Sequence, residues 1–94
     1  MPIVVMLKWK EITPEHYEKV RKIVNWEGNK PKGLQFHVAS FDKEGIMRVV
    51  DVWDSANDFD SFTKSRLMPG VQQIGVKSQP QVETYPTHAI FAPK

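Results

Sequence analysis

Two residues on neighbouring predicted strands could do acid–base chemistry, His37 and Asp51. His37 stands in an apolar segment, and an imidazole titrates near pH ~6.5, so it can take or release a proton at neutral pH. It could equally be a structural histidine bonded to a neighbour. Asp51 stands between valines, where an unpartnered carboxylate is costly, so it either pairs with a His, Arg or Lys or faces a cavity. Whether His37 and Asp51 share a face depends on strand register, which a slip of one residue reverses.

Three further side chains are candidates for binding a substrate. Trp53 ends a strand beside Asp51 and could line a ligand site or simply belong to the core. Arg66 lies near the end of a predicted helix, where it is either a solvated surface cation or a contact for an anionic ligand. His88 follows Pro86 in the C-terminal tail and could reach a cavity mouth in its own chain or in a partner. Tyr17 could donate a phenolic hydrogen bond, but its helical spacing is better explained by packing.

Other chemistries have less support in the 94 residues. His37, His88 and Asp51 have the composition of a facial metal triad, but no HxxxH or HxD spacing supports one, so we expect no metal. The chain has no cysteine, which excludes disulfides and a cysteine nucleophile and fits a reducing cytoplasm. The 13 Lys and Arg are scattered and the net charge is only +2, which does not indicate a nucleic-acid surface.

Strand and helix signals alternate along a single domain, residues 1–94. The predicted strands are Ile3–Trp9, Leu34–Phe41, Arg48–Trp53 and Gln81–Tyr85. One helix begins at the Thr13-Pro14 cap and is closed by Trp26, and the other begins at Ser55 and is stopped at Met68-Pro69-Gly70, with one further helical turn after it. In the second strand, Leu34, Phe36 and Val38 are expected opposite the face of His37. The order predicts an α+β, ferredoxin-like βαββαβ fold, a four-stranded antiparallel sheet with both helices on one face.

Apolar residues occupy both faces of three predicted strands, and two helices can cover only one face. The other face would expose an apolar patch on the order of 600–1,000 Å², more than soluble monomers usually tolerate. A second copy that buries about 800 Å² per partner would cover it, so we predict a homodimer in which the apolar tail, Ile90 and Phe91, lies on the partner. The alternative is a monomer whose long loop and tail fold over the sheet.

No basic segment followed by an apolar run opens the sequence, and no apolar run approaches the ~20 residues of a membrane span. We therefore expect a cytoplasmic protein with no membrane partner.

The segment from Val50 to Phe62 reads V-x-x-W-x-S-x-x-x-F-x-x-F. With its element order, the chain resembles the dimeric α/β-barrel superfamily, in particular small antibiotic-biosynthesis-monooxygenase-like domains. The resemblance implies a ferredoxin-like protomer, a dimer and a ligand cavity between sheet and helices. Superfamily members include cofactor-free monooxygenases of polycyclic phenols, haem-degrading enzymes and proteins of no known activity. The haem-degrading members use a His on the helix after the matching Trp and an Asn on the first strand. This chain keeps Trp53 but has neither partner, so haem degradation is disfavoured.

Three functions remain open. The first is a small-molecule site, in the form of a monooxygenase without cofactor whose base is His37. The second is a non-catalytic ligand-binding or stress-response module. The third is RNA binding, which shares this element order, but the segment Lys32–Phe36 matches the RNA-recognition signature poorly and base-stacking aromatics are sparse, so we expect no nucleic-acid partner.

Overall fold

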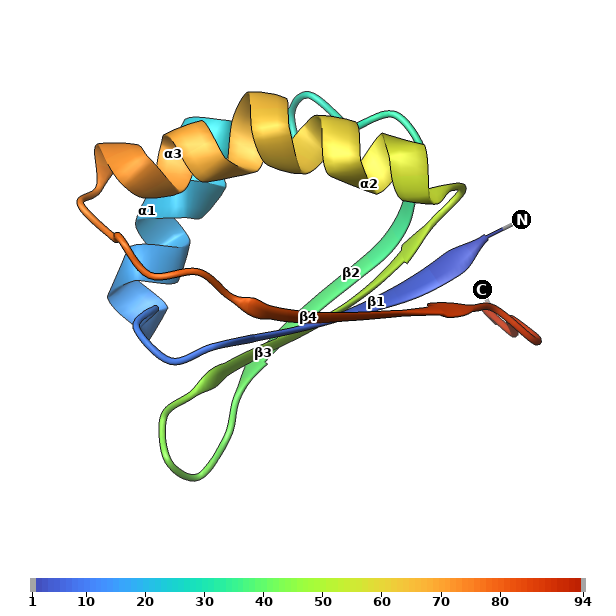
Figure 1. Ribbon diagram of the computed structural model, residues 1–94, viewed down its shortest axis with the longest axis horizontal. Helices are drawn as coiled ribbons and strands as arrows, with labels where there is room; N and C mark the ends of the chain where they lie inside the picture. Colours follow the sequence, from blue (N-terminus) through green and yellow to red (C-terminus); the bar gives the residue numbers. More distant parts are fainter. Residues whose placement is uncertain (1, 94) are drawn as a thin grey trace.

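The computed structural model describes residues 2–93 and has one sheet covered on one face by helices (Figure 1). Its elements, in chain order, are β1 (Ile3–Trp9), α1 (Pro14–Val24), β2 (Leu34–Phe41), β3 (Met47–Trp53), α2 (Ala56–Phe62), η1 (Thr63–Leu67), α3 (Met68–Gln73) and β4 (Gln81–Pro86). The strands lie in the order β2-β3-β1-β4, and every neighbouring pair is antiparallel. The predicted α+β, ferredoxin-like fold is confirmed.

The core lies between the sheet and the helices. β1 contributes Val5 and Leu7, β3 contributes Val49 and the fully buried Trp53, and the helices close over them. The buried apolar set is Val5, Leu7, Trp9, Ile12, Val20, Val24, Met47, Val49, Trp53, Phe59, Val71 and Val76. A side chain on this face of the sheet therefore lies in the space beneath the helices.

Helix α1 begins as predicted but ends two residues early. The Thr13 hydroxyl accepts a hydrogen bond from the backbone N–H of His16, 3.1 Å away. The helix stops at Val24 and not at Trp26, because Asn25 takes the left-handed conformation (φ 55°), which Asn tolerates better than most residues. Trp26 consequently lies in the turn after α1, where its ring can fold back toward the sheet.

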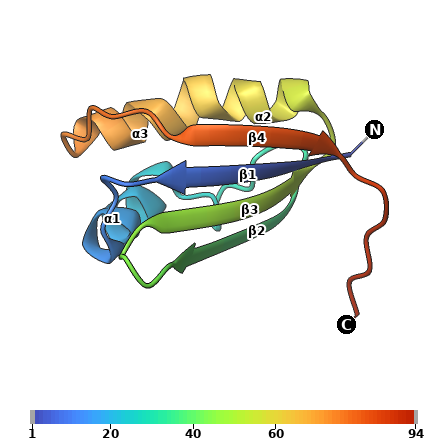
Figure 2. The same ribbon diagram turned by 60° about the horizontal axis from the view of Figure 1, so that its bottom comes forward.

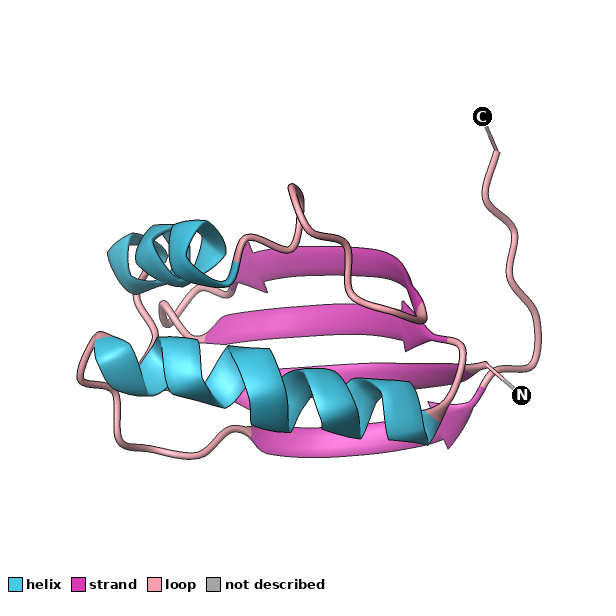
Figure 3. Ribbon diagram, turned by 90° about the horizontal axis from the view of Figure 1, so that it is seen from above, coloured by secondary structure: helices cyan, strands magenta, loops and turns pink. Residues whose placement is uncertain are grey.

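The expectation that Met68-Pro69-Gly70 stops the second helix is wrong. Helix continues to Gln73 through η1, a π-helical turn in which the Met68 N–H bonds to the Thr63 carbonyl. The wider turn ends just before Pro69, which then occupies the first turn of α3, where its missing N–H is not needed. Figure 3 shows the result, one long helical rod running over the sheet beside α1. At Gly70 an added Cβ would lie 2.7 Å from a Val24 methyl, so only glycine lets the two helices approach this closely.

A bulge in β2 sets which residues face the helices. The register pairs Leu34 with Trp53 but Phe36 with Val52, so that Gln35 is the extra residue. Leu34 therefore lies on the same face as His37, in contrast to the expected grouping with Phe36 and Val38. Beyond the bulge the alternation is as predicted.

No described element of the protomer covers the sheet face away from the helices (Figure 2), and apolar residues lie on it beside polar ones such as Lys8, Arg48 and Glu83. Val38, Val50 and Met6 form one row across β2, β3 and β1, and Phe36, Val52, Val4 and Tyr85 form the next. Of these residues, Met6, Phe36, Val38, Val50 and Tyr85 are between 41% and 59% exposed. We call these seven residues the rear apolar face.

Candidate acid–base site

His37 and Asp51 are direct cross-strand partners on the helix-covered face of the sheet. The Nδ1 atom of His37 lies 2.8 Å from Oδ1 of Asp51. Asp51 is the buried charged residue of the described core, at 5% exposure, and the imidazole is its partner. The register that the sequence left undecided thus brings the two candidate catalytic residues together.

The second carboxylate oxygen of Asp51 is also engaged. The indole Nε1–H of Trp53 donates to Oδ2 over 3.1 Å, and this contact is buried. Because an ionised carboxylate only accepts hydrogen bonds, the proton of the His37–Asp51 contact belongs to Nδ1. Neutral His37 therefore carries no hydrogen on Nε2, and that nitrogen is an acceptor that points away from the sheet.

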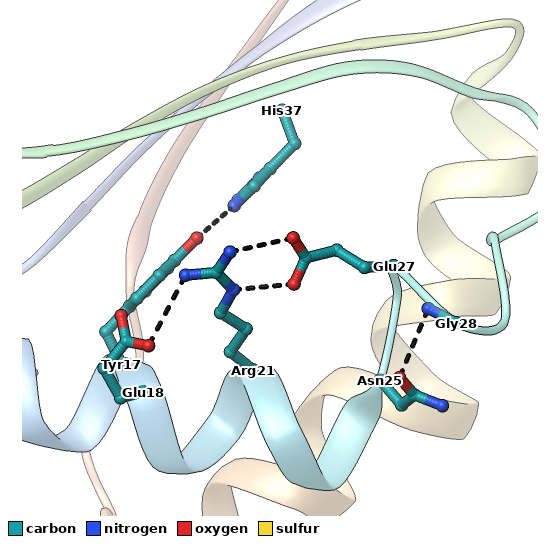
Figure 4. A network of polar contacts seen from close by, with 7 residues as sticks. All are labelled: Tyr17, Glu18, Arg21, Asn25, Glu27, Gly28 and His37. Atoms are coloured by element: carbon teal, nitrogen blue, oxygen red, sulfur yellow. Dashed lines mark hydrogen bonds and ion pairs between the residues drawn. The ribbon is translucent and has the colours of Figure 1, made fainter.

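A third residue completes the chain of hydrogen bonds. The Tyr17 hydroxyl, from α1, lies 2.8 Å from Nε2 of His37 (Figure 4). Burial raises the pKa of Tyr17, against a smaller opposing effect of Arg21, so the phenol stays protonated at neutral pH and donates to Nε2. The order is Trp53, Asp51, His37, Tyr17, running from the core to the edge of the helix layer. Sequence reasoning treated Tyr17 as packing, although a half-buried tyrosine hydroxyl needs a partner and a strand histidine is one.

Aromatic rings surround the outer end of this chain. The Trp26 ring centroid lies 5.1 Å from that of His37 and 5.7 Å from that of Tyr17. The Tyr17 and His37 rings are parallel, 6.1 Å apart. The imidazole is thus held between a strand, a helix and the turn after that helix.

Two spaces meet at these three rings. Inside lies an apolar cavity of about 50 Å³ between sheet and helices, whose wall includes Leu7, Trp53 and Phe62. Outside lies an open groove of about 420 Å³, whose wall includes Arg21 and Glu27. Tyr17, Trp26 and His37 line both. They are the partition between the core cavity and the groove.

Charged groups line the groove. Arg21 binds Glu27 through two contacts, Nε to Oε1 at 2.6 Å and Nη2 to Oε2 at 2.8 Å, and Glu18 lies 3.4 Å from Nη1. The Arg21 guanidinium lowers the pKa of the Glu27 carboxyl. Figure 4 shows this pair beside the Tyr17–His37 contact. The groove wall therefore carries one guanidinium and one carboxylate, paired with each other, and Glu18 contacts Arg21 from outside the groove lining.

The other predicted binding residues lie in different surroundings. Trp53 is fully buried, packed on Phe59 and Phe62, and reaches the site through Asp51. The Arg66 Nη2 donates to the backbone carbonyls of Val24 and Asn29, both at 2.8 Å, and so joins η1 to the end of α1.

His88 is exposed in the C-terminal tail, which leaves the sheet beside the N-terminal end of β1 (Figure 2). Within the protomer it is not part of the His37 site.

Among residues 2–93, no group of three or more His, Asp or Glu side chains is placed to hold a metal ion. No helix in the same range is long and apolar enough to cross a membrane.

No protein-family model and no curated protein matches the sequence. Solved structures do match it. SnoaB, a cofactor-independent oxygenase from Streptomyces nogalater, has a TM-score of 0.66 and 12% identity over 98% of this chain and 97% of that chain. Rv0793 from Mycobacterium tuberculosis has a TM-score of 0.68 and 12% identity over 98% of this chain and 100% of that chain. NE2512, a protein of unknown function from Nitrosomonas europaea, has a TM-score of 0.70 and 11% identity over 99% of this chain and 95% of that chain. At these identities the likeness shows the fold alone, and it agrees with the ferredoxin-like α+β architecture described above.

Proposed function

We propose that this protein binds a small phenolic molecule at His37 and that the Asp51–His37 pair takes the proton of its hydroxyl. One observation carries the proposal, the hydrogen-bond chain from Trp53 through Asp51 to His37 at the partition between an apolar cavity and an open groove. A base needs an unprotonated nitrogen aimed at the substrate, and Asp51 fixes the tautomer that provides it.

Each residue of the pair has a separate task. Nε2 of His37 accepts the proton, and the Asp51 carboxylate stabilises the imidazolium that forms, through the 2.8 Å contact to Nδ1. Trp53 holds the second carboxylate oxygen in place. Arg21 lies at the groove wall, where the Glu27 carboxylate holds its guanidinium in place.

Oxygenation is the reaction for which a phenolate is useful. An electron-rich phenolate can give electrons to O₂, so that a ring methylene becomes a carbonyl, one oxygen atom enters the product and the other leaves as water. All four electrons then come from the substrate, and the chain's own part is proton transfer. The shared fold with SnoaB, described as a cofactor-independent oxygenase, supports this reaction class.

The working unit that we propose is a homodimer in which the two rear apolar faces pack against each other. Two rows of apolar side chains lie exposed across the sheet, which is costly for a soluble protomer. Ile90 and Phe91 are 44% and 89% exposed in a tail that leads away from the protomer (Figure 2), and we propose that they lie on the partner.

A non-catalytic binding module is the second candidate. The specific observation in its favour is that both ring nitrogens of His37 are already occupied, by Asp51 and Tyr17. Such a protein would bind its ligand without turnover, in the cavity or in the groove.

The test uses anthrone, whose enol is a phenol and whose methylene can be oxidised, with O₂ uptake and product mass as readouts. We expect turnover by the wild type and at least a hundredfold loss in His37→Ala, in line with the contribution of one general base. His16→Ala removes a half-buried histidine at the start of α1, where its ring contacts the Thr13 cap and not the His37 site, and should keep full activity. Bound but unconverted anthrone in the wild type would support the binding module instead. Turnover unchanged in His37→Ala would exclude His37 as the base.

A further inference from the structure

We propose that Tyr17 is a built-in competitor for the substrate: its phenol occupies the place at His37 that the substrate hydroxyl must take, and its displacement joins the core cavity to the groove. This inference rests on the proposed function and narrows its ligand to aromatic molecules that carry an O–H donor. Three observations support it, the occupied nitrogen, the size of the cavity and the position of the aromatic partition.

The occupied nitrogen comes first. Nε2 of His37 can accept one in-plane hydrogen bond, and Tyr17 donates it at 2.8 Å. Nδ1 is held by Asp51, so the imidazole has no second acceptor to offer. A ligand that reaches His37 must therefore break the Tyr17 contact. A ligand with its own hydrogen-bond donor restores what is lost, whereas an apolar ligand that covers Nε2 leaves this acceptor without a partner, which is unfavourable.

The core cavity is too small for an aromatic ligand unless the Tyr17 ring is displaced. A cavity of about 50 Å³ has room for a few water molecules, whereas an engineered apolar cavity that takes up benzene measures roughly 150 Å³. The groove offers about 420 Å³ but is open and partly polar. Ligand pockets usually measure about 300–1,000 Å³ and are mostly apolar. Joining the two spaces gives a pocket of that kind, with apolar walls inside and Arg21 at the mouth.

Two of the three partition residues, Tyr17 and Trp26, come from outside the sheet. His37 is fixed by its strand and by Asp51. Trp26 lies in the turn between α1 and β2, and Tyr17 is in the first turns of α1 with its hydroxyl as its polar anchor (Figure 4). Rotation of these two rings toward the groove opens the path and leaves the hydrogen-bond chain below them unchanged.

The test compares the wild type with Tyr17→Phe, which keeps the ring and removes the hydroxyl. The probes are 1-naphthol, which has the donor, and naphthalene, which has the same rings without it, with binding followed by fluorescence or calorimetry. We expect 1-naphthol to bind Tyr17→Phe about 3–10 times more tightly than the wild type, since one hydrogen bond no longer competes. Naphthalene must displace the same hydroxyl without replacing its hydrogen bond. It should therefore bind each protein several times more weakly than 1-naphthol does, and gain from Tyr17→Phe by a similar factor. Tyr85→Phe is the control for loss of a tyrosine hydroxyl, since Tyr85 belongs to the rear apolar face, on the side of the sheet away from His37.

A second measurement needs no ligand. Diethylpyrocarbonate acylates an unprotonated imidazole nitrogen that is free of hydrogen bonds, and mass spectrometry reports it residue by residue. His37 should react slowly in the wild type and several times faster in Tyr17→Phe, with exposed His88 as the internal standard.

Each outcome decides the matter. If 1-naphthol binds both proteins equally, or Tyr17→Phe more weakly, Tyr17 is not a competitor, while His37-dependent turnover of anthrone would still uphold the proposed function. If 1-naphthol binds neither protein, the assigned ligand class is wrong, and this inference is overturned with it. Equal acylation of His37 in both proteins would show that Tyr17 does not cover Nε2.

Discussion

Asp51 accepts two hydrogen bonds at once, and this double role fixes the chemistry of His37. In Asp51→Asn the amide can accept only through its oxygen, so its NH₂ group must face either Trp53 Nε1–H or His37 Nδ1. We expect the amide to donate to Nδ1, since the imidazole can exchange its tautomer and the indole cannot. Nε2 then carries the hydrogen and can no longer take a proton from a phenol.

The Asp51→Asn protein should fold with a stability loss of about 1–3 kcal/mol, typical of a disturbed buried hydrogen bond. Its ¹⁵N spectrum should report His37 in the Nε2–H tautomer, where the wild type has Nδ1–H. Phenol-dependent activity should fall by a factor similar to that of His37→Ala. An unchanged tautomer with lost activity would give Asp51 a role other than orienting the imidazole.

Much of this site was readable from residue types, and its geometry was not. The position of Asp51 between valines and of His37 in an apolar strand predicted that each side chain has a polar partner. Their pairing depended on the register of the β2–β3 hairpin, which no local pattern encodes. Tyr17 was assigned to packing because helical spacing explains its ring, while its hydroxyl partner lies 20 residues further along the chain.

At the level of elements, Arg66 illustrates how a candidate binding residue can have a structural task. Its guanidinium satisfies carbonyls at the C-terminal end of α1 and stacks over Phe62, 5.3 Å from the ring centroid. We expect Arg66→Met to lower the free energy of unfolding by about 1–3 kcal/mol, because charged hydrogen bonds to the carbonyls of Val24 and Asn29 are lost. Urea unfolding measures this, with Lys64→Met as a charge-matched control within about 0.5 kcal/mol of the wild type. Weaker 1-naphthol binding at unchanged stability would instead assign Arg66 to the ligand site.

The β2–β3 hairpin, which sets the register of His37 and Asp51, depends on Asp42. Its carboxylate accepts from the N–H groups of Glu44 and Ile46 and from Arg48 Nε, at 2.9–3.0 Å. The Ile46 N–H is the main cause that lowers the pKa of Asp42. A carboxyl whose pKa is lower in the folded state stabilises the fold above its unfolded pKa of about 4, and this contribution is lost as pH falls through the folded value.

Asp42→Asn should therefore reduce the melting temperature at pH 7, and the two proteins should converge as pH falls through the lowered pKa of the wild-type carboxyl. Thermal unfolding followed by circular dichroism between pH 2 and 7 measures the difference. Glu44→Gln removes a carboxyl from the same turn and should follow the wild-type curve. A difference between Asp42→Asn and wild type that is constant with pH would mean that the charge of Asp42 is not what holds the turn.

The element boundaries show where local signals suffice. Caps at Thr13 and Ser55 begin helices as predicted, because their hydroxyls bond to backbone groups three residues on. The predicted stop at Pro69 failed because η1 shifts the hydrogen-bond register by one residue just before it. A proline ends a helix only where its missing N–H was required, and a π turn removes that requirement.

At the scale of the whole molecule, element order and apolar patterning sufficed to predict the protomer fold, since each strand and helix is locally consistent with it. The same patterning predicts what the protomer alone does not contain, a partner for the rear apolar face. Val50 lies near the middle of that face, between Val38 on β2 and Met6 on β1. In a two-fold dimer each substitution there occurs twice, so Val50→Lys would bring two positive charges into one apolar interface.

We expect the wild type to be a dimer of 10.9 kDa chains at micromolar concentration and Val50→Lys to be a monomer, measured by sedimentation equilibrium. Its dissociation constant should rise at least about a hundredfold, since burying unpaired charge costs several kcal/mol. Ile23→Lys is the matched control, because Ile23 is 40% exposed on α1 and Val50 is 41% exposed. Helix α1 lies on the opposite side of the sheet, so this variant should stay dimeric. A monomeric wild type, or a dimer lost equally in both variants, would refute sheet-to-sheet assembly. The His37 site would still stand, since all its residues come from one chain.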